Sequence, residues 1–145
     1  MKIERVKESD FPRAAEVYEA SWRESHKHVC TPEFLEKRDC AGYLREKMDG
    51  LYQIRDRDVV GVFYLADQDF STLYIHPDHQ HKGYGTECLR YALRGKDRLR
   101  LTVLSSNKNA IRLYEKMNFR FSGKETPLNN GIREREMIYT EKKYG

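Results

Sequence analysis

The sequence predicts a mixed α/β fold, because segments with the period of strands alternate with segments with the period of helices. Residues 51–55 and 59–65 are rich in β-branched and aromatic side chains and are separated by a short charged link, which predicts a hairpin. An apolar helical face precedes the hairpin, formed at three- and four-residue steps by Phe11, Ala14, Ala15, Tyr18 and Trp22. The 145 residues, 39% of them hydrophobic, suffice for one buried core, so we expect a single domain over residues 1–145.

The first fifty residues are expected to hold an edge strand and two helices. Residues 2–7 have the pattern of the strand, and Ser9 is expected to cap the first helix, with Pro12 in its first turn. A loop is expected over residues 23–30. The second helix is expected to begin after Thr31, at a proline. Its buried side is expected to consist of Phe34, Leu35, Ala41, Leu44 and Met48.

The remaining residues are expected to alternate between strands and helices. Residues 67–69 turn the chain into a fourth strand that ends at Pro77, and residues 99–104 form a fifth strand. A helix-like stretch lies between these two strands, and another follows the fifth. The last two strands are expected at residues 120–124 and 134–140, joined by a loop that contains Pro127 and Asn130-Gly131.

The most informative motif is the glycine-containing run at residues 80–85, which follows the fourth strand and opens a helix. Glycines let the backbone approach a ligand, and the first amides of a helix attract anions, so the run predicts a phosphate site. A P-loop is excluded, because Lys82 precedes Gly83 and no Gly-Lys-Ser/Thr sequence is present. The dinucleotide-binding fingerprint is excluded as well, because Cys88 stands where its third glycine is required.

The motif and its surroundings resemble the GNAT superfamily of acyl-CoA-dependent N-acetyltransferases. Gln80, Gly83 and Gly85 match the family's short signature. Residues 73–77 resemble its fourth strand, and residues 107–119 resemble the second helix on the CoA side. The resemblance implies a mostly antiparallel sheet of six or seven strands flanked by helices. It also implies that the fourth and fifth strands splay apart and that acetyl-CoA binds between them.

The resemblance assigns the acetyl-CoA site residue by residue. The expected cofactor-binding residues are Leu73, Ile75, Gln80, His81, Lys82, Gly83, Tyr84, Gly85, Thr86, Asn107 and Asn109. Leu73 and Ile75 would pair through their backbone groups, while their side chains also fit an ordinary core strand. Asn107 would bind the pantetheine amide. Asn109 fits a helix cap as well as a cofactor contact.

The implied reaction is direct transfer of the acetyl group to a primary amine in a ternary complex. Tyr114 occupies the position of the family's general acid, although packing alone also explains a buried phenol. Asp69 is the nearest candidate for the general base, with Asp67 behind it, and both also fit plain turn residues. A catalytically inactive acyl-CoA sensor or interaction module is the alternative function.

The acceptor pocket is expected between the first two helices, the fourth strand and the last hairpin. Trp22, His26 and His28 are candidates for lining it, and Trp22 also completes the apolar stripe of its helix. The acceptor is a small molecule or a protein amine. The sequence departs mildly from the family at Gly95, which is expected to shorten a helix, and at Asn118, where asparagine replaces a common glycine.

Composition excludes several other functions. The net charge of +4 comes from 27 basic and 23 acidic residues that are interleaved along the chain, as in a solvated surface, so we expect no nucleic-acid partner. No apolar run approaches the roughly 20 residues of a membrane span, and no signal peptide is evident. Three unpaired cysteines fit a reducing compartment, so we expect a cytoplasmic protein.

Neither a metal site nor covalent catalysis is expected. His76, His79 and His81 lie close together, but no matching carboxylate or thiol set accompanies them. Cys88 is expected on the buried face of a helix and not as a nucleophile. An exposed final strand at residues 134–140 would allow a homodimer, which we expect, although its charges fit a protected monomer equally well.

Overall fold

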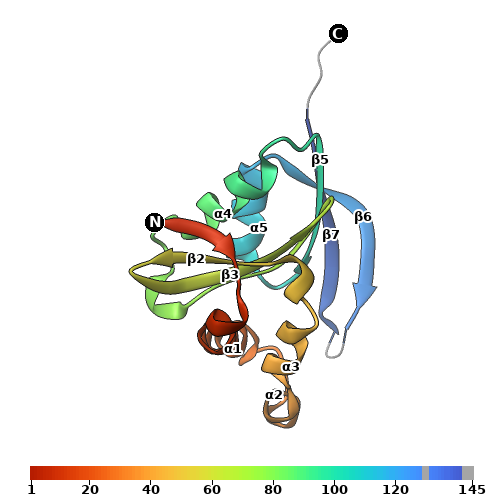
Figure 1. Ribbon diagram of the computed structural model, residues 1–145. Coiled ribbons are helices and arrows are strands. Elements are labelled where there is room, and N and C mark those ends of the chain that lie inside the picture. The colour runs from red at the N-terminus through yellow and green to blue at the C-terminus, as the bar shows by residue number, and fades with distance from the viewer. Residues whose placement is uncertain (129–130, 142–145) are drawn as a thin grey trace.

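The computed structural model describes residues 1–128 and 131–141, which form a seven-stranded sheet with helices on both faces (Figure 1). The strand order is β1-β2-β3-β4-β5-β7-β6, and every neighbouring pair is antiparallel except β4 and β5. The strands are β1 (Lys2–Arg5), β2 (Leu51–Asp56), β3 (Asp58–Ala66), β4 (Asp69–Ile75), β5 (Arg98–Leu104), β6 (Phe119–Pro127) and β7 (Arg133–Thr140). The main helices are α1 (Phe11–His26), α2 (Pro32–Lys37), α3 (Cys40–Arg45), α4 (Tyr84–Leu93) and α5 (Lys108–Lys116). Among the described residues, no helix has the length and apolar composition needed to cross a membrane.

The two faces of the sheet carry separate cores. Neighbouring side chains on a strand point to opposite faces, so Val62 of β3 packs with α1 and α3, whereas Phe63 packs with α4 and α5. The α1 side contains Phe11, Ala14, Tyr18, Trp22 and Leu44, and the α4 side contains Phe70, Leu89, Leu99, Phe119 and Met137. Figure 1 shows α1, α2 and α3 together on one side and α4 with α5 on the other.

The first helix begins and ends later than the sequence indicated. A 3-10 turn, η1 (Glu8–Asp10), contains Ser9, so the predicted Ser9 cap is wrong and Asp10 occupies the N-cap position. The placement of Pro12 in the first turn is confirmed. The helix continues to His26 because the His26 ring stacks on Trp22 one turn earlier, with ring centroids 4.2 Å apart. The loop expected at residues 23–30 therefore begins four residues later, after His26.

The predicted second helix is two short helices. Thr31 caps α2 as predicted, with its side chain accepting a hydrogen bond from the Phe34 amide at 3.2 Å. Asp39 interrupts the helical path, because its carboxylate accepts from the Gly42 amide at 2.9 Å and starts α3. Leu44 is buried as predicted, but the prediction is wrong for Phe34, which is 46% exposed.

The predicted divergence of the fourth and fifth strands is confirmed. Among the described residues, β4 pairs with β5 only at Asp69 and Arg100. Beyond this pair the two strands separate. A bulge in β4 accompanies the divergence, since Thr72 and Leu73 together face one residue of β3. Thr72 has a φ of 57°, which is unusual for a β-branched residue and indicates a locally constrained backbone.

The end of the chain differs from the expected edge strand. Strand β7 lies between β5 and β6, so residues 134–140 are internal to the sheet and the predicted exposed edge is wrong. The edge on this side is β6, which extends to Pro127. Asn130 of the predicted loop lies outside the described residues. The expected special conformation at Asn118 is confirmed by its φ of 71°.

The first prediction concerns the contact between β3 and β4. A Cβ atom on Gly61 would lie 2.5 Å from Cδ1 of Ile75 and 3.1 Å from the carbonyl oxygen of Tyr74. We expect Gly61→Ala to lower the free energy of unfolding by about 1–3 kcal/mol through overpacking, as measured by urea denaturation. An unchanged free energy would contradict this close packing.

Candidate active site

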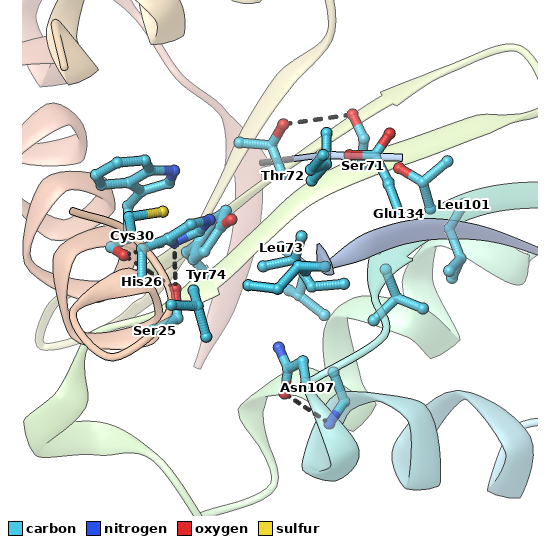
Figure 2. Close-up of a pocket in the computed structure, with 18 of the residues that line it drawn as sticks. Ser25, His26, Cys30, Ser71, Thr72, Leu73, Tyr74, Leu101, Asn107 and Glu134 are labelled. Atoms are coloured by element: carbon cyan, nitrogen blue, oxygen red, sulfur yellow. Dashed lines mark hydrogen bonds between the residues drawn. The ribbon is translucent and has the colours of Figure 1, made fainter. Parts of the chain in front are cut away.

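A cavity of about 680 Å³ lies where β4 and β5 diverge. Its walls come from α1, the α2–α3 region, β4, β5, α5 and the start of β7. Figure 2 shows His26 and Cys30 on one side, Glu134 with Ser71 on another, and Leu73 and Asn107 between them. The cavity therefore joins segments from nearly the whole length of the chain.

The predicted phosphate loop presents backbone amides at the start of α4. His81 and Gly83 have φ angles of 65° and 89°, and no side chain of the described residues caps the helix. The amides of its first turn are therefore free to attract an anion. Gly85 packs closely against α5, because a Cβ atom there would lie 3.2 Å from Cδ2 of Leu113 and that side chain would have to shift slightly. Lys82 is exposed beside these amides, and Thr86 lies in the first turn.

Two side chains of the loop are engaged by the protein itself. Gln80 donates a hydrogen bond from Nε2 to the carbonyl oxygen of Ile75 at 3.0 Å. The Tyr84 hydroxyl donates to Oδ2 of Asp56 at 2.5 Å, and this hydrogen bond lowers the pKa of the Asp56 carboxyl. These contacts hold the loop against β4 and the β2–β3 hairpin. The side chains of Gln80 and Tyr84 thus position the loop, while the backbone amides at the start of α4 have no side-chain cap among the described residues.

The free edge of β4 is continuous with this loop. The His76 amide donates to the carbonyl oxygen of Val60 in β3 at 2.8 Å. Because backbone groups of antiparallel strands alternate in direction, the groups of Ile75 point away from β3, toward the separation from β5. Leu73 lies at the bulge and faces the cavity (Figure 2). Of the two predicted strand residues, Leu73 lines the cavity and Ile75 does not, and residues 80–86 of the loop lie outside the cavity lining as well.

Tyr114 lines the cavity from α5 and is only 7% exposed. Burial raises the pKa of its phenol, so the hydroxyl stays protonated at neutral pH. Asn107 also lines the cavity and caps α5, with Oδ1 accepting from the Ala110 amide at 3.2 Å. Asn109 is exposed, does not line the cavity, and accepts a hydrogen bond from Arg112 at 2.8 Å.

On the acceptor side, His26 is held in one tautomer. Its Nδ1 lies 2.8 Å from the carbonyl oxygen of Trp22, and because a carbonyl can only accept, Nδ1 carries the proton. The Nε2 atom then carries a lone pair that can accept a proton. His26 and Trp22 both line the cavity. Burial lowers the pKa of His26, and the nearby Arg38 lowers it further, against the effect of the Trp22 hydrogen bond. The imidazole is therefore neutral at pH 7.

Two predicted residues do not join this cluster. Asp69 lies at the fork of β4 and β5, where its Oδ1 accepts hydrogen bonds from Nε and Nη2 of Arg100 at 3.0 and 2.7 Å. It lines a separate surface depression with Asp67 and does not line the Tyr114 cavity. His28 is exposed and does not line the cavity either. The structure therefore separates the expected base from the expected acid.

Several lining residues were not singled out by the sequence. They are Tyr18, Cys30, Arg38, Tyr43, Tyr74 and Glu134. Arg38 lies where one continuous helix was expected, and Glu134 was assigned to an outer strand. The break before Asp39, a residue type that often caps helices, was the signal that could have revealed the turn containing Arg38.

The cysteines and histidines do not suggest other chemistry. Burial raises the pKa of the Cys88 thiol to about 12, so its reactive thiolate is scarce. Within the described part of the chain, no group of three or more His, Cys, Asp or Glu residues is placed to hold a metal ion.

A sheet that splays beside a glycine loop, with a cavity at the fork, defines the fold of an acyl-CoA-dependent transferase. The sequence model of the acetyltransferase (GNAT) family matches residues 11–119. This match covers most of the chain, and the protein belongs to the acetyltransferase (GNAT) family. No curated protein sequence matches significantly.

Solved structures of this family share the fold at low sequence identity. A GNAT-family acetyltransferase from Streptococcus agalactiae aligns with a TM-score of 0.80 and 13% identity, covering 98% of this chain and 96% of that one. The PaiA N-acetyltransferase from Thermoplasma acidophilum, in complex with coenzyme A, has a TM-score of 0.71, 18% identity and coverages of 97% and 98%. YncA from Salmonella typhimurium, with acetyl-CoA, has a TM-score of 0.71, 18% identity and coverages of 100% and 96%.

Proposed function

We propose that the protein transfers an acetyl group from acetyl-CoA to a primary amine. The observation that carries the proposal is the divergence of β4 from β5, which leaves backbone groups of β4 unpaired between the uncapped N-terminus of α4 and the cavity that Tyr114 lines. We take this edge as the path of the ligand. Family membership and neighbours that contain coenzyme A or acetyl-CoA support the same ligand.

The residues along the path fit the parts of acetyl-CoA in order. The pyrophosphate is proposed to bind the backbone amides of residues 83–86, with Lys82 adding positive charge and the His81 ring adding a hydrogen-bond donor. The pantetheine arm is proposed to pair with backbone groups of Leu73, at the bulge, and of Ile75, whose carbonyl oxygen already accepts a hydrogen bond from Gln80. Asn107 is proposed to donate to the arm from its amide nitrogen, while its Oδ1 caps α5.

The proposed reaction proceeds without a covalent enzyme intermediate. The neutral amine attacks the thioester carbonyl, forming the C–N bond, and an amide of β4 near Ile75 donates to the developing oxyanion. The C–S bond then breaks, and Tyr114 protonates the departing thiolate. The amine nitrogen loses one proton in the process, so a base is required.

His26 is our candidate for this base in place of Asp69. Its Nε2 carries a lone pair, its ring is neutral at pH 7, and it lines the cavity. Asp69 is bound to Arg100 outside this cavity, which leaves it no direct route to the amine. The Trp22 carbonyl that fixes the tautomer also stabilises the imidazolium formed after proton transfer.

A second prediction tests the phosphate site through Gly83. Aspartate tolerates a positive φ and is a favoured helix cap, so Gly83→Asp should fold while placing a negative charge at the proposed pyrophosphate site. We expect its Kd for acetyl-CoA in calorimetric titration to rise by about tenfold or more through charge repulsion. The matched neutral variant Gly83→Asn should lose much less affinity. Equal affinities of the two variants would contradict this site.

A third prediction concerns the general acid. Tyr114→Phe removes only the hydroxyl, so we expect kcat to fall by about a hundredfold while the Kd for acetyl-CoA stays constant. Tyr139→Phe is the matched control, because Tyr139 also packs on Phe119 but does not line the cavity. A wild type that binds acetyl-CoA but acetylates no amine would instead support the non-catalytic sensor.

A fourth prediction concerns pH. Because the pKa of His26 lies below its usual 6.5, wild-type kcat/KM should decrease as pH falls through this lowered pKa, where the base becomes protonated. We expect His26→Gln to reduce kcat by about a hundredfold and to lack this acid limb. The ratio of wild-type to variant kcat/KM isolates His26, because deprotonation of the amine affects both enzymes equally. A ratio that does not depend on pH would exclude His26 as the base.

A further inference from the structure

Arg38 places a positive charge in the cavity wall, and aromatic rings hold its guanidinium. Its Cζ lies 4.9 Å from the ring centroid of Trp22 and 4.4 Å from that of Tyr43. Its Nη2 donates a hydrogen bond to the hydroxyl of Tyr18 at 3.0 Å. The carbonyl oxygen of Arg38 accepts from Arg23, so the backbone is fixed as well. The charge is therefore positioned before any ligand arrives.

The structure pairs Arg38 with no carboxylate among the residues it describes. Within residues 1–128 and 131–141, no carboxylate lies within 4.0 Å of the Arg38 guanidinium. Other arginines are paired, as Arg13 is with Asp58 and Arg100 with Asp69. Arg38 is half-buried, and its Nε is a buried donor without an acceptor. A half-buried, unpaired charge is unfavourable, and an anionic ligand would relieve that cost.

Tyr18 adds a second donor at the same place. Its hydroxyl oxygen accepts from Arg38, so its own proton remains available to another acceptor. Tyr18 is only 1% exposed, and burial raises its pKa to about 12, which keeps the hydroxyl neutral and protonated. The guanidinium and the phenol together form a donor pair suited to a carboxylate.

The opposite wall carries the opposite charge. Glu134, at the start of β7, is half-buried beside Ser71 in the cavity (Figure 2). No ion pair to Glu134 is formed within the described parts of the chain. Aromatic rings occupy the wall near Arg38, including Trp22 and Tyr43. The cavity thus presents a cation, an apolar wall and a carboxylate to one occupant.

We propose that the acceptor is an α-amino acid, or an amine of similar size that carries a carboxylate, with an apolar or aromatic side chain. Arg38 and Tyr18 bind the carboxylate, the aromatic rings contact the side chain, and the amino group faces His26, while the negative charge of Glu134 across the cavity favours an amine. This inference rests on the proposed acetyl transfer and specifies its acceptor. Polyamines and amines without an anionic group would meet an unfavourable cation at Arg38.

The sole tryptophan of the chain gives a direct measurement, because Trp22 contacts the Arg38 guanidinium. The probes are N-acetyl-L-leucine, a product of the proposed reaction, and N-acetyl-L-leucinamide, which lacks the charge. Each is titrated in the presence of CoA while Trp22 fluorescence is recorded. We expect the carboxylate to bind about tenfold more tightly or better, as a charge-assisted hydrogen-bond pair provides.

Two variants separate the charge from the packing. Arg38→Met should abolish the preference for the carboxylate, whereas Arg38→Lys should retain part of it. Lys47→Met is the matched control, because Lys47 also lies 5.4 Å from the Tyr43 ring centroid but does not line the cavity. It should keep the full preference.

The outcomes distinguish this inference from the proposed function. Equal binding of the two probes by the wild type, tighter binding of the amide, or no binding of either probe would overturn the acceptor assignment. Acetyl-CoA binding and acetylation of leucinamide would still support acetyl transfer in that case. Failure to bind acetyl-CoA would overturn the proposed function, and tight carboxylate binding without CoA would then leave Arg38 as an anion site of another kind.

Discussion

The separation of β4 from β5 is the constraint on which the rest of the structure depends. Parallel strands ordinarily satisfy each other's backbone groups, but here they are in register only at Asp69 and Arg100. Backbone groups beyond that point require another partner, and the cavity supplies the space for one. The same separation leaves room for Tyr114 to approach from α5. An edge that is unpaired in the middle of a sheet is therefore the physical reason for a ligand site at this position.

The separation persists because each strand is fixed on its other side. β5 is registered with β7 along its length, from Arg98 opposite Thr140 to Leu104 opposite Glu134, while β4 is registered with β3. The fork itself is closed by Arg100, which pairs with Asp69 at 2.7 Å and with Glu136 at 3.3 Å. Asp69 thus links β4 to β5 through its ion pair with Arg100. Its position close to the fourth strand in sequence made it a reasonable base candidate, but its ion pair directs it away from the cavity.

Local sequence patterns predicted the parts of the fold and site that short segments determine. The glycine loop, the hairpin at residues 51–65 and the helix that presents Tyr114 depend on turn chemistry and periodicity, which a single sequence carries. The insertion of β7 between β5 and β6 depends on long-range pairing, which leaves no comparable local pattern. Arg38 was missed for a similar reason, because its role depends on rings from α1 and α3 that meet only in the folded chain.

The proposed cofactor half and the proposed acceptor half of the site present different kinds of groups, backbone groups in one and side chains in the other. The proposed cofactor half relies mainly on backbone amides and carbonyls, which tolerate many side chains provided that glycines keep the loop open. The proposed acceptor half relies on the side chains of His26, Arg38 and Glu134, which line the cavity from three different segments. Replacing one of these side chains can change the charge that an acceptor meets without altering the path for acetyl-CoA. Acceptor choice is therefore separable from cofactor binding, and the unpaired charge of Arg38 is the feature with the greatest influence on it.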